Sequence, residues 1–175
     1  MEFEHHDQDT AEPPTAQVWA PDDIIAFVGS LPGVVAVTAS EAGGAPEIAR
    51  GDTFFFYDPD GEGRTGRRMP FATIVTKDYD GFDTASDLNR PGVFRVNLGV
   101  GRAAFEELIG YPPATHAEKS DRYDYTAVDR LLPHPAYATQ AWVAIVNPGE
   151  TTTAQARTLL TEAHARAARP RRPTA

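Results

Sequence analysis

An arginine and an asparagine stand two positions apart in a stretch where polar and apolar residues alternate. Arg95 and Asn97 are interleaved with Phe94, Val96 and Leu98, and this period of two is typical of a half-buried strand. The cation and the amide therefore belong to one face of a sheet, and the apolar side chains belong to the other. On a sheet face that helices leave open, a guanidinium and a carboxamide suit a small anionic or planar ligand.

Four further side chains extend this candidate site. Lys77 and Tyr57 belong to predicted neighbouring strands, and His134 and Trp142 stand near the last strand. Together with the arginine and the asparagine they are the predicted ligand-binding residues. The alternative is that the arginine pairs with an aspartate and the asparagine satisfies backbone groups.

His134 is the best single candidate for a catalytic residue. An imidazole titrates near neutral pH, and the prolines on either side of this histidine hold its backbone in place. A general base needs partners within hydrogen-bond reach, and the sequence offers Asp129 or Glu162 without deciding between them. The chain contains no nucleophile elbow, phosphate-binding loop or zinc-protease motif, so the sequence leaves open whether the protein is an enzyme.

A loop rich in arginine supports a different function. The segment 61–70 joins two predicted strands and carries Arg64, Arg67 and Arg68. Two antiparallel strands with a long basic loop between them look like a wing, which predicts nucleic-acid binding as the alternative function. The net charge of -9 for the whole chain opposes that interpretation, because duplex binding requires clustered positive charge.

Size and composition narrow the class of protein. The chain has 175 residues, of which 41% are hydrophobic, and it contains no cysteine. This is the size of one domain, and the lack of cysteine fits a reducing compartment. No apolar run reaches the ~20 residues that span a bilayer, and the N-terminus does not resemble a secretory signal. We therefore expect a cytoplasmic protein that uses no membrane, no metal and no cofactor.

The order of the predicted elements indicates an α+β domain over residues 21–169. An acidic tail expected to be disordered precedes it over 1–20, and a basic tail follows over 170–175. Short links among the central strands indicate an antiparallel sheet of about five strands with helices packed on one face. The predicted elements are a helix at Pro21–Leu31, strands at Val34–Val37, Thr53–Tyr57, Phe71–Lys77 and Val93–Leu98, a helix ending at Gly110, either a helical turn or an edge strand within Tyr123–Leu132, a strand at Trp142–Asn147, and a final helix through Ala156–Ala167.

Several short motifs in the chain resemble those of known families. Between Pro21 and Ala168 the runs SLPGV, RPGVFRVNLGV, PHP-Y, W-I-NPG and LL-EAH are similar to those of an uncharacterised bacterial domain family. More remotely, the chain resembles the MmcQ/YjbR-like proteins in element order. That resemblance implies a compact α+β domain and a DNA-binding label that rests on analogy with winged folds. It implies no catalytic residues, and this chain lacks the lysines expected near the V-x-L strand.

These observations lead to three hypotheses about function. The first is a cytoplasmic binding or accessory protein with a small-molecule or protein ligand on the open face of the sheet. The second is nucleic-acid binding through the loop 61–70. The third is an enzyme that uses His134 as a general base.

Overall fold

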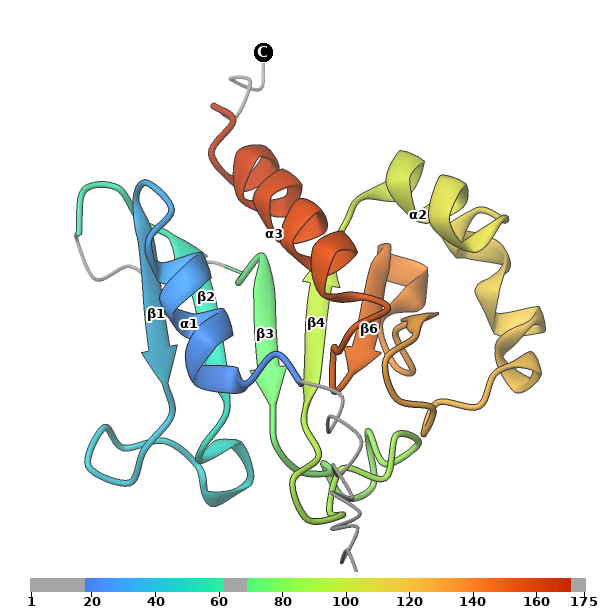
Figure 1. The fold of residues 1–175 in the computed structure, drawn as a ribbon, viewed down its shortest axis with the longest axis horizontal. Coiled ribbons are helices and arrows are strands. Elements are labelled where there is room, and N and C mark those ends of the chain that lie inside the picture. Colours follow the sequence, from blue (N-terminus) through green and yellow to red (C-terminus); the bar gives the residue numbers. More distant parts are fainter. Residues whose placement is uncertain (1–17, 62–68, 171–175) are drawn as a thin grey trace, which may run out of the picture.

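A computed structural model describes residues 18–61 and 69–170 (Figure 1). Within these residues one sheet of six strands carries three α-helices. None of the described helices is long and apolar enough to cross a lipid bilayer. The strands are β1 (Val34–Thr38), β2 (Thr53–Tyr57), β3 (Ala72–Val75), β4 (Arg95–Gly99), β5 (Leu131–Pro133) and β6 (Trp142–Val146); the α-helices are α1 (Pro21–Gly29), α2 (Arg102–Ile109) and α3 (Thr153–Ala167); and short 3-10 helices are η1 (Glu47–Ala49), η3 (Pro113–Glu118), η4 (Ser120–Arg122) and η5 (Ala138–Gln140).

Every pair of neighbouring strands is antiparallel, in the order β1-β2-β3-β4-β6-β5. This confirms the predicted α+β class and the antiparallel sheet, but the prediction of about five strands was wrong by one. The extra strand is β5, a three-residue edge strand that pairs with β6. It ends in Pro133, and a proline is tolerated at an edge because it has no N–H to donate to the ladder.

The apolar face of the sheet lies under the helices. Ile74, Val96 and Ile145 stand in register across β3, β4 and β6, and none is more than 1% exposed. Helices α1 and α3 cross this face (Figure 1), and Ile24 of α1 and Leu160 of α3 are fully buried against it. Burying a side chain of this size contributes roughly 1.5–3 kcal/mol, so this layer supplies most of the driving force for folding.

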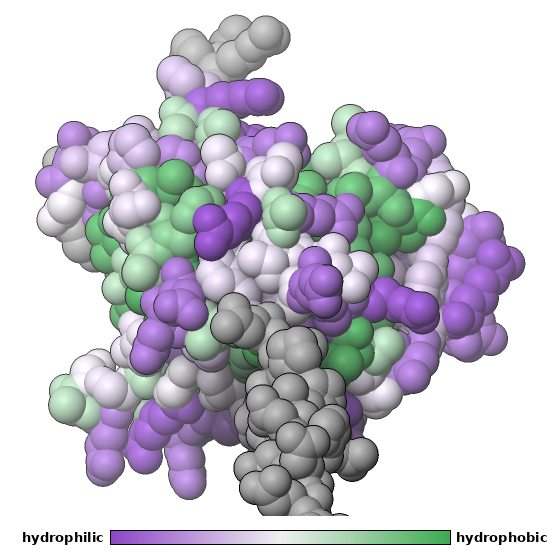
Figure 2. Space-filling view, in the orientation of Figure 1, coloured by the Kyte–Doolittle hydropathy of each residue, from purple (hydrophilic) through white to green (hydrophobic). Residues whose placement is uncertain are grey.

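The alternation of β4 leaves its polar residues on the other side. Val96 and Leu98 enter the helix-covered core, so Arg95 and Asn97 project from the opposite face. On the helix side, the surface mixes hydrophilic residues with hydrophobic areas beside α1 and α2 (Figure 2). The candidate site therefore belongs to the face that is turned away in that view.

The described residues before the predicted start of the domain at residue 21 include a core residue. Trp19 falls within the predicted tail, yet it is 7% exposed and belongs to the core. Its amide donates a 2.7 Å hydrogen bond to the carbonyl of Pro148, and its ring packs edge-on against Phe27 at 5.6 Å. The hydrogen bond anchors the residues before α1 to the segment that follows β6.

Gly101, the residue before α2, gives a testable prediction. Its φ is 82°, a backbone conformation that favours glycine, and a β-carbon there would lie 1.8 Å from Nη1 of Arg166. We expect Gly101→Ala to lower the free energy of unfolding by about 1–3 kcal/mol, measured by urea denaturation. The control is Gly29→Ala at the end of α1, where an added β-carbon meets nothing within 4 Å. Equal stability of the two variants would contradict the prediction.

Candidate ligand-binding site

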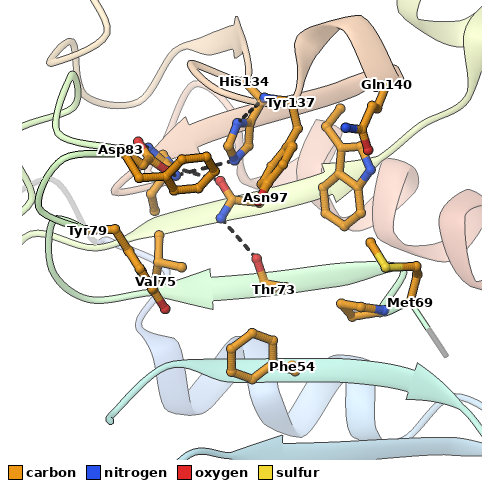
Figure 3. A pocket seen from close by; sticks show the side chains of 14 residues that line it. Phe54, Met69, Thr73, Val75, Tyr79, Asp83, Asn97, His134, Tyr137 and Gln140 are labelled. Atoms are coloured by element: carbon orange, nitrogen blue, oxygen red, sulfur yellow. Dashed lines mark hydrogen bonds and ion pairs between the residues drawn. The ribbon is translucent and has the colours of Figure 1, made fainter. Parts of the chain in front are cut away.

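The sheet face opposite the helices carries a cavity of about 280 Å³. This volume lies near the lower end of the ~300–1,000 Å³ that is usual for ligand pockets. Side chains from β2, β3, β4 and β6 point into it, together with side chains from the segments before and after β3 and after β5 (Figure 3). The lining residues are Phe54, Met69, Pro70, Thr73, Val75, Tyr79, Phe82, Asp83, Arg95, Asn97, His134, Tyr137, Gln140 and Trp142.

The floor of the cavity is a chain of hydrogen bonds along the sheet. Thr73 of β3 stands opposite Asn97 of β4. The Asn97 amide donates to the Thr73 hydroxyl at 2.9 Å, and its carbonyl oxygen accepts from Nε of Arg95 at 2.7 Å (Figure 3). Arg95 and Asn97 are 1% and 2% exposed. The alternation in the sequence predicted that these two side chains share one face. The hydrogen bonds of the cavity floor hold both in fixed orientations.

Asp83, from the connection between β3 and β4, neutralises the buried arginine. Nη1 and Nη2 of Arg95 donate to the two carboxylate oxygens of Asp83 at 3.1 and 2.5 Å, and Nη1 also donates to the Ser86 hydroxyl at 2.8 Å. Burial raises the pKa of Asp83, but the hydrogen bonds and charge of Arg95 outweigh it and hold the pKa below its usual value. Because these are the only two charged residues among the described lining residues, the cavity carries no net charge.

His134 closes the polar end of the cavity. Its Nδ1 accepts hydrogen bonds from the amides of Ala136 at 3.0 Å and Tyr137 at 2.9 Å, and its Nε2 lies 3.3 Å from Nη2 of Arg95. Burial, and then the positive charge of Arg95, lower the pKa of His134 to about 3 against a smaller opposing effect of Asp83. The ring is therefore neutral at pH 7. Since Nδ1 acts as an acceptor, the single ring proton is on Nε2.

Aromatic and apolar side chains form the walls. The ring of Tyr137 lies 5.0 Å from the His134 ring and 5.7 Å from the Phe82 ring, measured between centroids. Phe82 is 59% exposed and Met69 is 77% exposed, and both line the cavity. Large apolar side chains gathered in the open around a pocket are typical of a binding site.

Tyr57, one of the predicted ligand-binding residues, does not line this cavity. The cavity face of β2 carries Phe54, and a residue three positions further along a strand points to the other face. Tyr57 accordingly packs under the helices, with its ring 5.8 Å from that of His164 on α3.

Lys77 is also excluded from the cavity. It lies two residues beyond the end of β3, and its Nζ donates a hydrogen bond to the carbonyl of Arg50. Its side chain lines a separate, shallower hollow with Leu88 and Val93. The alternation of β3 does not extend past Val75, so the side chain of Lys77 is placed by the loop and not by the sheet.

The two predicted partners of His134 lie elsewhere. The carboxylate of Asp129 accepts hydrogen bonds from the amides of Gly149, Thr151 and Thr152 at 2.8–2.9 Å, at the start of α3. Glu162 is exposed on α3, on the helix side of the sheet. The charged groups that act on His134 are Arg95 and Asp83.

Asp129 instead holds the turn that leads into α3. Burial raises its pKa, but the hydrogen bonds from Thr152, Thr151 and Gly149 outweigh this and lower the pKa to about 2. We expect Asp129→Asn to cost about 1 kcal/mol of unfolding free energy, because it weakens charge-assisted hydrogen bonds to the amides of this turn. Thermal unfolding followed by circular dichroism at pH 7 measures this, with the exposed Asp121→Asn as the control. No difference between the two variants would show that these hydrogen bonds do not stabilise the turn.

The cavity includes residues that the sequence did not indicate. Asp83 sits in a polar connection with several other aspartates, and nothing in the spacing distinguishes it. Phe54 and Phe82 gave no signal beyond their aromatic character. Tyr137 lies within the PHP-Y run, three residues after His134, and that short spacing was the one available sign that the two rings would pack together.

The alternative nucleic-acid site lies outside the described residues. Arg64, Arg67 and Arg68 all fall within 62–68. The strands on either side of that segment, β2 and β3, pair as an antiparallel hairpin, which agrees with the predicted connection. Nucleic-acid binding through these arginines stays a prediction.

One comparison with known proteins identifies a family for almost the whole chain. The model of a family of unknown function, DUF6194, matches residues 19–174. The chain belongs to this family. The match spans every residue that lines the cavity. No curated protein and no solved structure matches the chain. Membership of DUF6194 confirms the prediction of an uncharacterised domain family, whereas the bacterial origin and the likeness to MmcQ/YjbR-like proteins stay predictions.

Proposed function

We propose that this DUF6194 protein is a binding or accessory protein that holds a small molecule in the cavity over β3, β4 and β6. The observation that carries the proposal is the combination of a buried polar end at Arg95, Asn97 and His134 with aromatic walls that remain open to solvent. Ligand pockets typically combine mostly apolar walls with a few well-placed polar groups. A cytoplasmic location is part of the proposal and rests on the absence of cysteine.

Burial of the polar end costs folding free energy, and a role in ligand binding would explain why the protein retains it. Burying an ion pair such as Arg95–Asp83 requires desolvation of both charges, and well-packed apolar residues at such positions are often at least as stabilising. Phe82 and Met69 likewise leave most of their apolar surface in water in the unliganded protein. A ligand that covers these side chains and contacts the polar end supplies a reason for both features.

The shape of the site favours a small molecule over a protein partner. A protein surface would need a broad contact of ~800 Å² on each side, whereas the cavity is concave and about 280 Å³ in volume. The absence of net charge among the described lining residues favours an uncharged ligand, since an ion would be desolvated without a counter-charge. A planar apolar body fits between the rings of Tyr137, Trp142 and Phe54.

A fragment screen by thermal shift tests this proposal. Compounds that stabilise the wild-type protein should bind about 3- to 10-fold more weakly to Phe82→Ala, which removes one aromatic wall. Phe82 is 59% exposed, so the variant should fold normally. The matched control is Ile48→Ala on η1, another exposed apolar residue at 43%, which lies outside the cavity. If stabilising compounds act equally on both variants, the ligand site is not this cavity.

The other two hypotheses have less support. For nucleic-acid binding, the relevant arginines are not described, and the net charge of -9 opposes it; duplex binding that is absent at ~50 mM salt would remove it. For a general base, His134 would need a free lone pair facing the cavity, whereas its Nδ1 already accepts two hydrogen bonds. The likeness to MmcQ/YjbR-like proteins would gain weight only from a solved structure with the same strand order.

A further inference from the structure

We infer that the polar end of the cavity binds one uncharged carbonyl oxygen, which bridges Arg95 and His134 from the cavity side, so that the ligands are neutral aromatic carbonyl compounds. This inference rests on the proposed function and narrows its ligand class. It follows from counting the N–H groups at the polar end and the acceptors that face them.

Arg95 has one N–H group left after its partners are counted. A guanidinium has five N–H groups. One at Nε donates to Asn97, two at Nη1 donate to Asp83 and Ser86, and one at Nη2 donates to the second oxygen of Asp83. The remaining Nη2 hydrogen faces Nε2 of His134 at 3.3 Å.

His134 cannot accept that hydrogen while its ring is neutral with Nε2 protonated. The two backbone amides at Nδ1 hold the proton on Nε2. Two N–H donors, from Nη2 of Arg95 and Nε2 of His134, therefore meet without an acceptor between them. Both side chains are at least 98% buried and both line the cavity. Leaving two buried N–H donors without an acceptor costs stability. A single acceptor oxygen within hydrogen-bond distance of both nitrogens satisfies the two donors together.

The charges around the two donors favour an oxygen without a formal charge. The guanidinium is already neutralised by Asp83. A carboxylate or phosphate would place a second anion close to that carboxylate in a buried site, where like charges repel strongly. A carbonyl oxygen accepts two hydrogen bonds and brings no charge. The site therefore differs from an arginine pocket for anions, although both use a guanidinium.

The rings beside the donors define the rest of the ligand. Tyr137 packs against His134 at 5.0 Å, and Trp142 meets the His134 ring edge-on at 6.5 Å. A planar group attached to the bound carbonyl would lie between these rings and Phe54 across the floor. An aryl ketone or aryl amide has this arrangement of a flat apolar body with an acceptor at one end.

The first experiment measures the protonation of His134 without any ligand. Long-range ¹H–¹⁵N correlation at pH 7 separates protonated from unprotonated ring nitrogens, and loss of the signal in His134→Asn assigns it among the five histidines of the chain. We expect an unprotonated Nδ1 and a protonated Nε2. The reverse tautomer would let Nε2 accept from Arg95 and would overturn this inference, while the proposed function would stand.

The second experiment compares three probes that share one ring. Acetophenone carries the carbonyl oxygen, α-methylstyrene replaces that oxygen with a CH₂ group, and benzoate replaces the ketone with an anion. We expect acetophenone to bind about tenfold more tightly than either of the others, as a pair of hydrogen bonds provides. In His134→Asn the side-chain oxygen still accepts from the backbone amides but the Nε2 donor is gone, so the preference over α-methylstyrene should shrink to about threefold or less. His164→Asn, on the helix side, should keep it.

The outcomes separate the inference from the proposed function. Equal binding of acetophenone and α-methylstyrene overturns the carbonyl site and leaves a ligand cavity. Tightest binding of benzoate overturns the requirement for an uncharged oxygen. If none of the three probes binds, the inference falls, and the fragment screen with Phe82→Ala then decides whether the cavity binds any ligand.

Discussion

Replacement of Arg95 by methionine is expected to lower the free energy of unfolding by about 3–5 kcal/mol. The guanidinium is 1% exposed and is the bidentate partner of the Asp83 carboxylate, which is 7% exposed. Methionine fills a similar volume but leaves that carboxylate buried without a counter-charge. It also removes the donor to the Asn97 carbonyl and thereby loosens the cavity floor. Urea denaturation followed by tryptophan fluorescence at pH 7 measures the loss.

A double variant separates the ion pair from simple packing. Adding Asp83→Asn to Arg95→Met removes the uncompensated charge, so we expect it to recover more than half of the lost stability. Arg102→Met, an exposed residue at the start of α2, serves as the control and should change stability by less than about 0.5 kcal/mol. A double variant no more stable than the single one would show that the pair does not carry the effect.

Acidification should destabilise the protein at pH values well above those at which its carboxylates become protonated. His134 has a pKa of about 3 in the folded protein against 6.5 for an ordinary histidine. The unfolded chain therefore binds more protons between these values, and linkage makes stability fall as the pH drops. The stability is fully present above pH 6.5 and decreases down to about pH 3. The difference in pKa corresponds to about 5 kcal/mol over the whole range.

His134→Asn should flatten this dependence. The asparagine oxygen replaces Nδ1 as the acceptor for the backbone amides of Ala136 and Tyr137, and the variant cannot titrate. Between pH 6.5 and 4 its unfolding free energy should fall much less than that of the wild type, and the remaining slope comes from His116, whose pKa burial also lowers. Below pH 4 both proteins should lose stability, because the pKa of Asp83 lies below its ordinary value of 3.8 and this carboxylate favours the folded state only while ionised.

The matched control for the pH profile is His164→Asn. His164 also makes a hydrogen bond, to the carbonyl of Pro32, and it also packs between aromatic rings. It lies on the helix side, away from the Arg95–Asp83 pair. Its variant should keep the wild-type slope between pH 6.5 and 4. A wild-type profile that is already flat in this window would contradict the buried neutral state of His134.

Periodicity was sufficient for the local structure. The alternation around Arg95 predicted β4 and the face of its polar residues, and the helical spacing of Ala156, Leu159, Leu160 and Ala163 predicted the buried side of α3, where all four are buried. Gly110 ends α2 in the left-handed conformation that its glycine suggested. These features depend on neighbours within one or two turns or on a single strand, so the local order of residues is enough to specify them.

Periodicity could not predict the strand register or the positions of the loops. Tyr57 and Phe54 are both aromatic residues of β2, and only pairing with β3 decides which of them enters the cavity. The short β5 was ambiguous because three residues do not establish a period. Lys77 follows β3 closely in sequence, but the loop beyond Val75 turns its side chain toward Arg50.

The sequence alone determined the α+β class, the antiparallel sheet and the polar face of β4, because these follow from the period of the apolar residues and the lengths of the links. Only the tertiary structure decided that Asp83 neutralises Arg95 and that two backbone amides orient the His134 ring. Both depend on loops of irregular conformation that meet over the sheet from positions 12 and 39 residues away from Arg95. No local pattern encodes such a meeting, since it is set by how the whole sheet pairs.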